Sequence, residues 1–216
     1  MSYKCVCFDF DGTLADTEQK AFDIYNEMAE KYKYKKITHE ELMKIKELTI
    51  PEIMEIIDIP FYKVPRVLRD GKKRMKEENE KIQAFKEEAD LYNFVIQADA
   101  LTDSLGIVTS NTKRTVHVFL ENYKIDDYFK FVICSSLTSK EKKLKKMCRK
   151  LKIQPQEMLY VGDETRDIIA SHKAGVDVVA VDWGYNTQAA LAKCHPEYEV
   201  NSLEEIICII KEKNGE

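Results

Sequence analysis

The stretch CVCFDFDGTLADT, residues 5–17, joins a short apolar run to two aspartates and a glycine. Residues 4–8 have the length and composition of a buried strand, and Asp9 follows them directly. In an open parallel sheet, reactive groups gather where strands end at their carboxyl edge. Residues two apart in an extended segment point the same way, so we expect Asp9 and Asp11 to converge there, before a turn that begins at Gly12.

The rest of the chain alternates between short apolar runs and segments with helical spacing, which is typical of a parallel sheet covered by helices. Further strands are expected at residues 105–108, 131–134, 158–161 and 178–181. Helices are expected near residues 113–123, 140–151, 165–174 and 202–212. This alternation predicts an α/β fold with a doubly wound, Rossmann-like parallel sheet.

Residues 18–98 have a different character, because they are rich in Lys, Glu, Met and Ile and contain a single glycine, Gly71. Apolar residues recur there at three- and four-residue spacing, which predicts helix throughout. A helical segment of this length is far longer than a crossover between two strands needs. We therefore predict a helical domain of residues 16–83, inserted into a catalytic core of residues 1–15 and 84–216.

Composition limits the classes of partner. The chain of 216 residues has 34 basic and 38 acidic residues, and its net charge of −4 offers no field that would recruit nucleic acid or an anionic membrane. We find no signal peptide and no apolar run of membrane-spanning length. The six cysteines form no Cys-x-x-Cys pair and fit reduced thiols. We expect a cytoplasmic protein that is a monomer or a homodimer.

A second strand end carries acids. In YVGDETRD, residues 160–167, Asp163 follows an apolar run and Asp167 lies one helical turn further on. Alone, Asp163 would be interpreted as a helix cap, but with Asp9 and Asp11 it favours a metal site. Carboxylates held close together repel each other, and a hard divalent cation offsets that repulsion. We predict Mg²⁺ bound by Asp9, Asp11 and Asp163, with Asp167 in support.

Between these acids lies LGIVTSNTK, residues 105–113, another apolar run that ends in hydroxyl and amide side chains. Thr109, Ser110 and Asn111 can donate hydrogen bonds to an anionic oxygen such as that of a phosphate. The alternative is that they cap the helix that follows, and both roles can hold at once. We predict that these three residues bind the phosphate of a substrate.

A lysine near the start of the helix at 140–151 completes the pattern. The ammonium of Lys140 would neutralise a phosphoryl group and an attacking carboxylate. Because the run KEKKLKKMCRKLK, residues 140–152, is rich in lysine, Lys142 is an alternative. Apolar residues recur at helical spacing within this run, which indicates an amphipathic helix with a solvated basic face rather than a nucleic-acid site.

Together these motifs resemble the haloacid dehalogenase superfamily, in its phosphatase branch with a helical cap inserted after the first strand. DFDGTLADT resembles the first signature of that family and VTSN the second, with Thr109 in the hydroxyl position. Lys140 resembles the third and GDETRD the fourth. The resemblance covers nearly the whole chain, although the segment SLTSKEKK lacks the Lys-Pro pair common in relatives.

The resemblance implies a magnesium-dependent phosphatase that acts on a small phosphorylated metabolite, such as phosphoglycolate or a sugar phosphate. Asp9 would attack phosphorus to form an aspartyl-phosphate, and Asp11 would protonate the leaving alkoxide and then activate water. Thr109 and Lys140 would hold the phosphoryl oxygens. Asp163 would complete the metal shell, together with the backbone carbonyl of Asp11.

Three alternatives are weighed against this interpretation. Asp11 together with Asp163 argues against a dehalogenase, which would lack the second acid. A phosphomutase of the β-phosphoglucomutase type would use the same motifs, and these do not exclude it. A non-catalytic module that only holds Mg²⁺ is disfavoured by the intact Asp9.

The segment VDWGYNT, residues 181–187, either lines the cleft or ends the last core strand, and the second is favoured.

Overall fold

The computed structural model describes residues 2–45, 59–77, 82–135 and 139–215. Its centre is a six-stranded sheet in the order β5-β4-β1-β6-β7-β8, in which every neighbouring pair is parallel. The strands are β1 (Cys5–Phe8), β4 (Ser104–Thr109), β5 (Phe129–Cys134), β6 (Met158–Gly162), β7 (Asp177–Val181) and β8 (Tyr198–Val200). The predicted doubly wound parallel sheet is confirmed.

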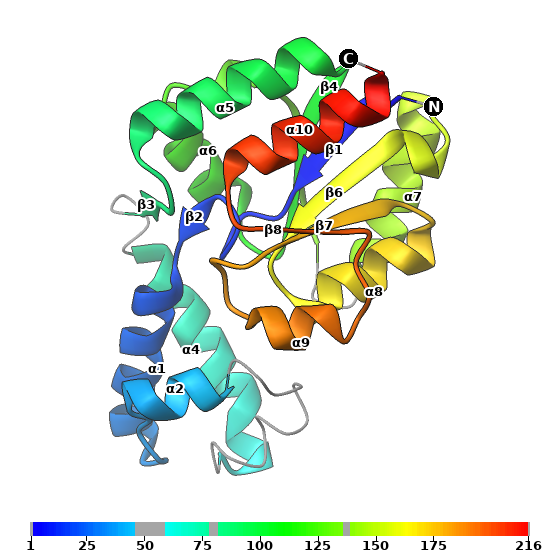
Figure 1. Cartoon of the computed structure of the whole chain (residues 1–216). Coiled ribbons are helices and arrows are strands. Elements are labelled where there is room, and N and C mark those ends of the chain that lie inside the picture. The colour runs from blue at the N-terminus through cyan, green and yellow to red at the C-terminus, as the bar shows by residue number, and fades with distance from the viewer. Residues whose placement is uncertain (1, 46–58, 78–81, 136–138, 216) are drawn as a thin grey trace.

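Helices cover both faces of this sheet (Figure 1). One face packs against α5 (Glu88–Leu101), α6 (Lys113–Asn122) and α10 (Leu203–Asn214), and the other against α7 (Lys140–Leu151), α8 (Thr165–Ala174) and α9 (Gln188–Ala192). Within β1, Val6 and Phe8 belong to the first core and Cys5 and Cys7 to the second. Burial on both faces explains why this strand is a continuous apolar run without alternation.

Strand register brings distant parts of the sequence to one edge of the sheet. Phe8, the last residue of β1, pairs with Ile107 of β4 and with Val161 of β6. The residues that follow these partners therefore leave the sheet at the same edge. The strand order also reverses at β1, since β4 and β5 lie on one side of it and β6, β7 and β8 on the other. Such a reversal opens a crevice at the carboxyl ends of the strands.

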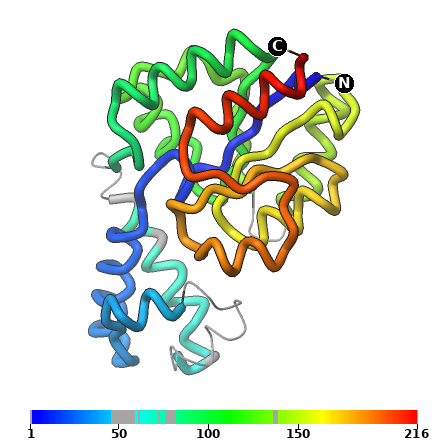
Figure 2. Tube along the Cα trace, in the orientation of Figure 1, coloured from blue at the N-terminus to red at the C-terminus, as the bar shows by residue number. Residues whose placement is uncertain are grey.

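Within the described residues, four helical elements lie between β1 and α5, namely α1 (Glu18–Tyr32), α2 (His39–Ile45), η1 (Phe61–Lys63) and α4 (Val64–Glu77). Figures 1 and 2 show α1, α2 and α4 grouped to one side of the sheet. Ile24 and Met28 of α1 pack against Val67 of α4 in a small core of their own. Parts of the predicted helical insertion, residues 46–58 and 78–81, lie outside the described residues.

The expectation of helix throughout residues 18–98 is wrong at residues 33–38, 59–60 and 82–87. Gln83–Ala84 form a short strand, β3, which pairs antiparallel with β2 (Ala15–Asp16). The pairing joins the two chain segments at which we place the boundaries of the inserted domain, and that division stays a prediction. A strand of two residues is too short to show an alternating pattern in the sequence. Its pairing depends on a partner far along the chain rather than on local sequence.

The expected helices and strands of the core lie within a few residues of their predicted bounds, but β8 and α9 were not expected.

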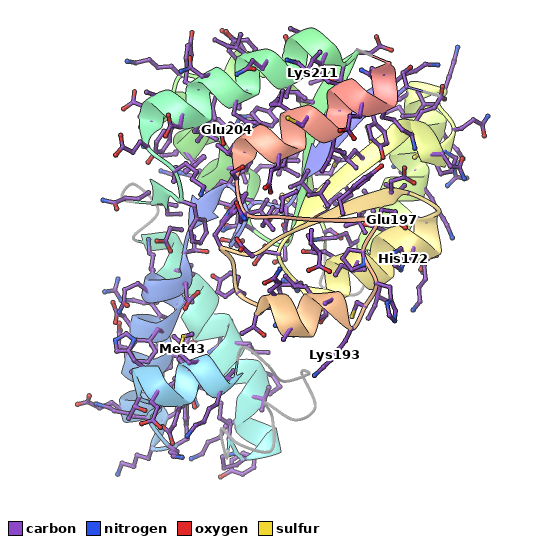
Figure 3. The ribbon with its side chains drawn as sticks, in the orientation of Figure 1. Met43, His172, Lys193, Glu197, Glu204 and Lys211 are labelled. Carbon is purple, nitrogen blue, oxygen red and sulfur yellow. The ribbon has the colours of Figure 1, made fainter. Side chains whose placement is uncertain are left out.

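Contacts to neighbouring elements hold the segment that leads into β8. Glu197 accepts a hydrogen bond from the amide of Val178 (2.8 Å). His172 of α8 lies 3.3 Å from the other carboxylate oxygen of Glu197, and Figure 3 labels both side chains.

All six cysteines are free thiols, and Cys5, Cys7 and Cys148 are buried. Burial raises the pKa of the Cys5 thiol to about 12, so that this side chain behaves as an inert apolar group. No helix within the described ranges is both long and apolar enough to cross a membrane.

Candidate active site

Three carboxylates meet at the carboxyl edge of the sheet. Asp9 follows β1, is 2% exposed and donates its backbone amide to the carbonyl of Val161 (2.8 Å). Asp163 follows β6, Asp167 lies in the first turn of α8, and both are fully buried. Asp9, Asp163 and Asp167 each present an oxygen, and these oxygens all lie within 4.8 Å of one another. We call this group the acid cluster.

Lys140 is the cation of the acid cluster. It is the first residue of α7 and only 6% exposed, and its ammonium donates to Asp9 Oδ2 (2.8 Å) and to Asp167 Oδ1. Lys142, the alternative from the sequence, is exposed. Burial acts to lower the pKa of Lys140, but the charges of Asp167 and Asp9 outweigh it and hold the pKa above its usual range. The side chain therefore stays an ammonium.

Opposing effects set the pKa of the Asp9 carboxyl. Burial raises the pKa of Asp9 to about 7, while the charge of Lys140 acts to lower it and that of Asp167 to raise it. Its Oδ1 accepts a hydrogen bond from the amide of Phe10 (2.8 Å), and its Oδ2 accepts from Lys140. The carboxylate is thus fixed at both oxygens in a low-dielectric site.

Asp11 lies beside the acid cluster, but its side chain is not a member of it. Its carboxylate accepts hydrogen bonds from Asn111 Nδ2 (2.9 Å to Oδ1, 3.2 Å to Oδ2) and from Thr17 Oγ1 (3.1 Å to Oδ1). Asp167, expected only in support, stands in the cluster where the Asp11 carboxylate was expected. Burial raises the pKa of Asp11, against the hydrogen bonds from Asn111 and Thr17, and a raised pKa suits a proton donor.

The end of β4 supplies the candidate phosphate-binding residues. The hydroxyl of the buried Thr109 accepts from the amide of Asn111 (2.9 Å), and Ser110 is exposed. The helix cap of α6 is Thr112, whose hydroxyl accepts from the amide of Thr115 (3.2 Å). Capping is therefore not the role of the Thr109 hydroxyl, although the Asn111 side chain accepts from the amide of Thr112 (2.7 Å).

Glycines let the surrounding turns close on Asp163. Gly12 has a φ of +81°, and a Cβ there would lie 2.0 Å from Asp163 Oδ2. At Gly184 a Cβ would lie 2.2 Å from the Cβ of Asp163. Thr13 Oγ1 donates to Asp163 Oδ1 (2.7 Å), and the amide of Tyr185 donates to Asp163 Oδ2 (2.8 Å). Only glycine fits either position without displacing this carboxylate.

Comparison with known proteins places this site in a family. The family model described as haloacid dehalogenase-like hydrolase matches residues 6–181, a span that holds the acid cluster, Lys140 and Thr109. The chain belongs to the haloacid dehalogenase-like hydrolase family. The family resemblance expected from the motifs is confirmed.

Relatives along the whole chain are named phosphatases. The chain is 28% identical over 196 residues to a phosphoglycolate phosphatase of Synechococcus elongatus, covering 90% of this chain and 91% of that protein. It is 26% identical to the pyrophosphatase PpaX of Oceanobacillus iheyensis, covering 97% and 98%. A haloacid dehalogenase-like hydrolase of Streptococcus pneumoniae has the same fold, with a TM-score of 0.82 at 16% identity over 96% of this chain and 98% of that one. The predicted phosphatase of this family is confirmed.

Some residues of the site gave no recognisable signal in the sequence. In this haloacid dehalogenase-like hydrolase Glu164 and Arg166 form an ion pair, and the charge of Glu164 acts to raise the pKa of Asp163 and of Asp9. Burial raises the pKa of Glu164, against the opposing charge of Arg166. Tyr185 was expected in a turn that ends a strand, yet its amide reaches Asp163. A tyrosine in a turn and an Arg–Glu pair are common on surfaces, so only the three-dimensional structure assigns them to the site.

Proposed function

We propose that this protein is a magnesium-dependent phosphatase that hydrolyses a small phosphate monoester through an aspartyl-phosphate on Asp9. The observation that carries the proposal is the placement of Asp9 at the end of β1, where it contacts Lys140 and the other acids of the cluster. A buried carboxylate held by a fixed cation, with a second acid two residues away, has the parts that covalent phosphoryl transfer needs.

The acid cluster fits a divalent metal. Asp9, Asp163 and Asp167 present hard carboxylate oxygens within 4.8 Å of one another, and carboxylates with water and phosphate oxygens form the usual shell of Mg²⁺. Lys140 alone offsets the charge of this cluster incompletely. When bound, Mg²⁺ neutralises the cluster and the phosphoryl oxygens, and the backbone carbonyl of Asp11 is a further candidate ligand.

In the first step, a carboxylate oxygen of Asp9 forms a bond to phosphorus while the bond from phosphorus to the leaving oxygen breaks. Asp11 transfers a proton to that oxygen, which leaves as an alcohol. Lys140 holds the nucleophile and, with Thr109, stabilises the negative charge on the phosphoryl oxygens. Ser110 and Asn111 offer further donors at the end of β4.

In the second step, water attacks the phosphorus of the aspartyl-phosphate. Asp11, now ionised, takes a proton from that water as the bond between phosphorus and Asp9 breaks. Inorganic phosphate leaves and both aspartates return to their starting states. The low exposure of Asp9 and the fixed donors around it make catalysis mainly a matter of positioning and charge compensation.

The substrate class is inferred from the named relatives. Phosphoglycolate and pyrophosphate are both small phosphorylated anions, and we extend that class, a small phosphorylated metabolite, to this chain. The choice within the class is assigned to the inserted domain of residues 16–83, because Thr17, at the start of α1, donates a hydrogen bond to Asp11.

A panel of small phosphate esters, with pyrophosphate included, tests the proposal at fixed Mg²⁺. We expect hydrolysis of p-nitrophenyl phosphate and of at least one metabolite, and Asp9→Asn should abolish both. The matched control is Asp90→Asn, at an exposed position of α5, which should change neither. Full activity in Asp9→Asn would refute the mechanism. A folded protein inactive on the whole panel would favour a magnesium-binding module, and transfer of phosphate between positions of one sugar a phosphomutase.

A further inference from the structure

The turn that follows β7 contacts two different parts of the active site through one residue. The amide of Tyr185 donates to Asp163 Oδ2 (2.8 Å), and its phenol oxygen lies 2.7 Å from the hydroxyl oxygen of Thr17. Thr17 is fully buried and follows β2 directly, at the start of the chain segment that leads into α1. Asp163 belongs to the acid cluster, whereas Thr17 belongs to the surroundings of Asp11.

The number of available protons fixes the direction of the hydrogen bonds between Tyr185, Thr17 and Asp11. A threonine hydroxyl has one proton, and Thr17 donates it to Asp11 Oδ1 (3.1 Å). The bond between Thr17 and Tyr185 must then be donated by the phenol. The result is a directed chain in which the Tyr185 hydroxyl donates to Thr17, and the Thr17 hydroxyl donates to Asp11. Without the phenol, the Thr17 oxygen would lose the donor that fixes its rotation.

The tyrosine is itself held in place by its neighbours. A Cβ at Gly12 would lie 2.6 Å from Tyr185 Cδ2, so the ring is in contact with the turn that carries Asp11 into β2. Trp183 Nε1 donates to the carbonyl of Thr13 (3.1 Å), and Lys86 Nζ lies 4.5 Å from the centre of the indole ring. On the other side of Tyr185, the amide of Asn186 donates to the carbonyl of Asp163 (3.3 Å). The turn is therefore held on both sides of Tyr185, as a positioning residue requires.

We propose that Tyr185 is a positioning residue that sets the acid–base carboxyl of Asp11 relative to the acid cluster, through Thr17 on one side and Asp163 on the other. The inference rests on the proposed function, since it assigns Asp11 the proton transfers. Asn111 also holds Asp11, by donating to both carboxylate oxygens. The specific role of Tyr185 is to keep the hydroxyl proton of Thr17 directed at Asp11 Oδ1.

A comparison of two leaving groups separates positioning from simple packing. An aliphatic alkoxide needs a proton to leave, whereas p-nitrophenolate leaves without one. A misplaced Asp11 should therefore slow phosphoryl transfer to Asp9 from an aliphatic phosphate but not from p-nitrophenyl phosphate. General acid–base catalysis contributes about 10²- to 10⁴-fold, and we expect Tyr185→Phe to lose about tenfold in kcat/KM for an aliphatic phosphate. The kcat/KM for p-nitrophenyl phosphate should stay within about twofold of wild type.

A double-mutant cycle tests whether Tyr185 acts through Thr17. Thr17→Val should show the same selective loss, Thr17→Ser should retain activity, and Thr17→Val with Tyr185→Phe should be no worse than Thr17→Val alone. The matched control is Tyr3→Phe, which removes a buried phenol that donates to Asp177 (2.6 Å). Tyr3 lies just before β1, at the opposite edge of the sheet from the acid cluster. Tyr3→Phe should leave the ratio of the two kcat/KM values unchanged.

The outcomes are distinct. An equal loss on both substrates in Tyr185→Phe, no loss on either, or additive losses in the double variant would overturn the positioning role while wild-type activity still supported the phosphatase. A wild-type protein that hydrolyses neither substrate would overturn the proposed function and this inference with it.

Discussion

Replacing Lys140 by methionine removes the cation of the acid cluster and keeps most of its volume. Its ammonium contacts Asp9 and Asp167, and the side chains of all three residues are at most 7% exposed. The substitution leaves two buried carboxylates without their counter-ion. Removing one partner of a buried ion pair costs about 3–5 kcal/mol, and we expect a loss of this size in the free energy of unfolding at pH 8 without metal.

The matched control is Lys142→Met, on the same helix two residues away. Because Lys142 is exposed, its replacement should change the free energy of unfolding by no more than about 0.5 kcal/mol. Urea unfolding of wild type and of both variants in the presence of EDTA measures the difference. Equal stabilities of the two variants at pH 8 would refute the assignment of Lys140 to the acid cluster.

The loss should also depend on pH. The pKa of Asp9 is raised to about 7 by burial, and removal of the Lys140 charge raises it further. Between the ordinary aspartate pKa of about 4 and this raised value, the folded state binds more protons than the unfolded state, so stability falls as pH rises. The wild type stops losing stability above about pH 7, where its Asp9 is ionised, whereas the variant continues to lose it, so the deficit of Lys140→Met should grow between pH 7 and pH 8. A deficit that shrinks over this range would contradict the buried-charge explanation.

Other substitutions and ions test single parts of the site. Asp11→Asn should slow turnover of an aliphatic phosphate by about 10²- to 10⁴-fold in stopped assays, and near-normal turnover would remove its acid–base role. Ca²⁺ should inhibit the Mg²⁺-dependent reaction because its larger shell misplaces Asp9, so strong activity with Ca²⁺ alone would count against this metal site. Gly12→Ala should reduce the rise in melting temperature on adding Mg²⁺, since a Cβ there meets Asp163 at 2.0 Å. Gly71→Ala, where the nearest side-chain atoms are 3.9 Å away, should retain that rise.

The parts of the site that lie at strand ends could be predicted from the sequence. Asp9 and Asp163 each follow an uninterrupted apolar run, and parallel strands end at a common edge, so composition and order were enough to bring them together. The same reasoning holds for Thr109, the last residue of β4. Lys140 became distinguishable from Lys142 only in the structure, because both lie in one lysine-rich run and only burial separates them.

The direction of the Asp11 side chain could not be predicted. Alternation along an extended segment pointed it at the same volume as Asp9, but the chain turns at Gly12, and Asn111 and Thr17 draw the carboxylate away from the acid cluster. Both partners come from other elements, and no local pattern reports such contacts. The β2–β3 pair and the reach of Tyr185 to Thr17 escaped prediction for the same reason.

The most direct test of the account is to identify the residue that carries phosphate during turnover. Asp11→Asn should accumulate the intermediate with p-nitrophenyl phosphate, because this leaving group needs no proton while the attack of water needs Asp11. Acid quenching followed by peptide mass spectrometry should then find one phosphate on Asp9. Phosphate on a different residue, or no phosphorylated peptide in a variant that still releases p-nitrophenol in a burst, would contradict the account.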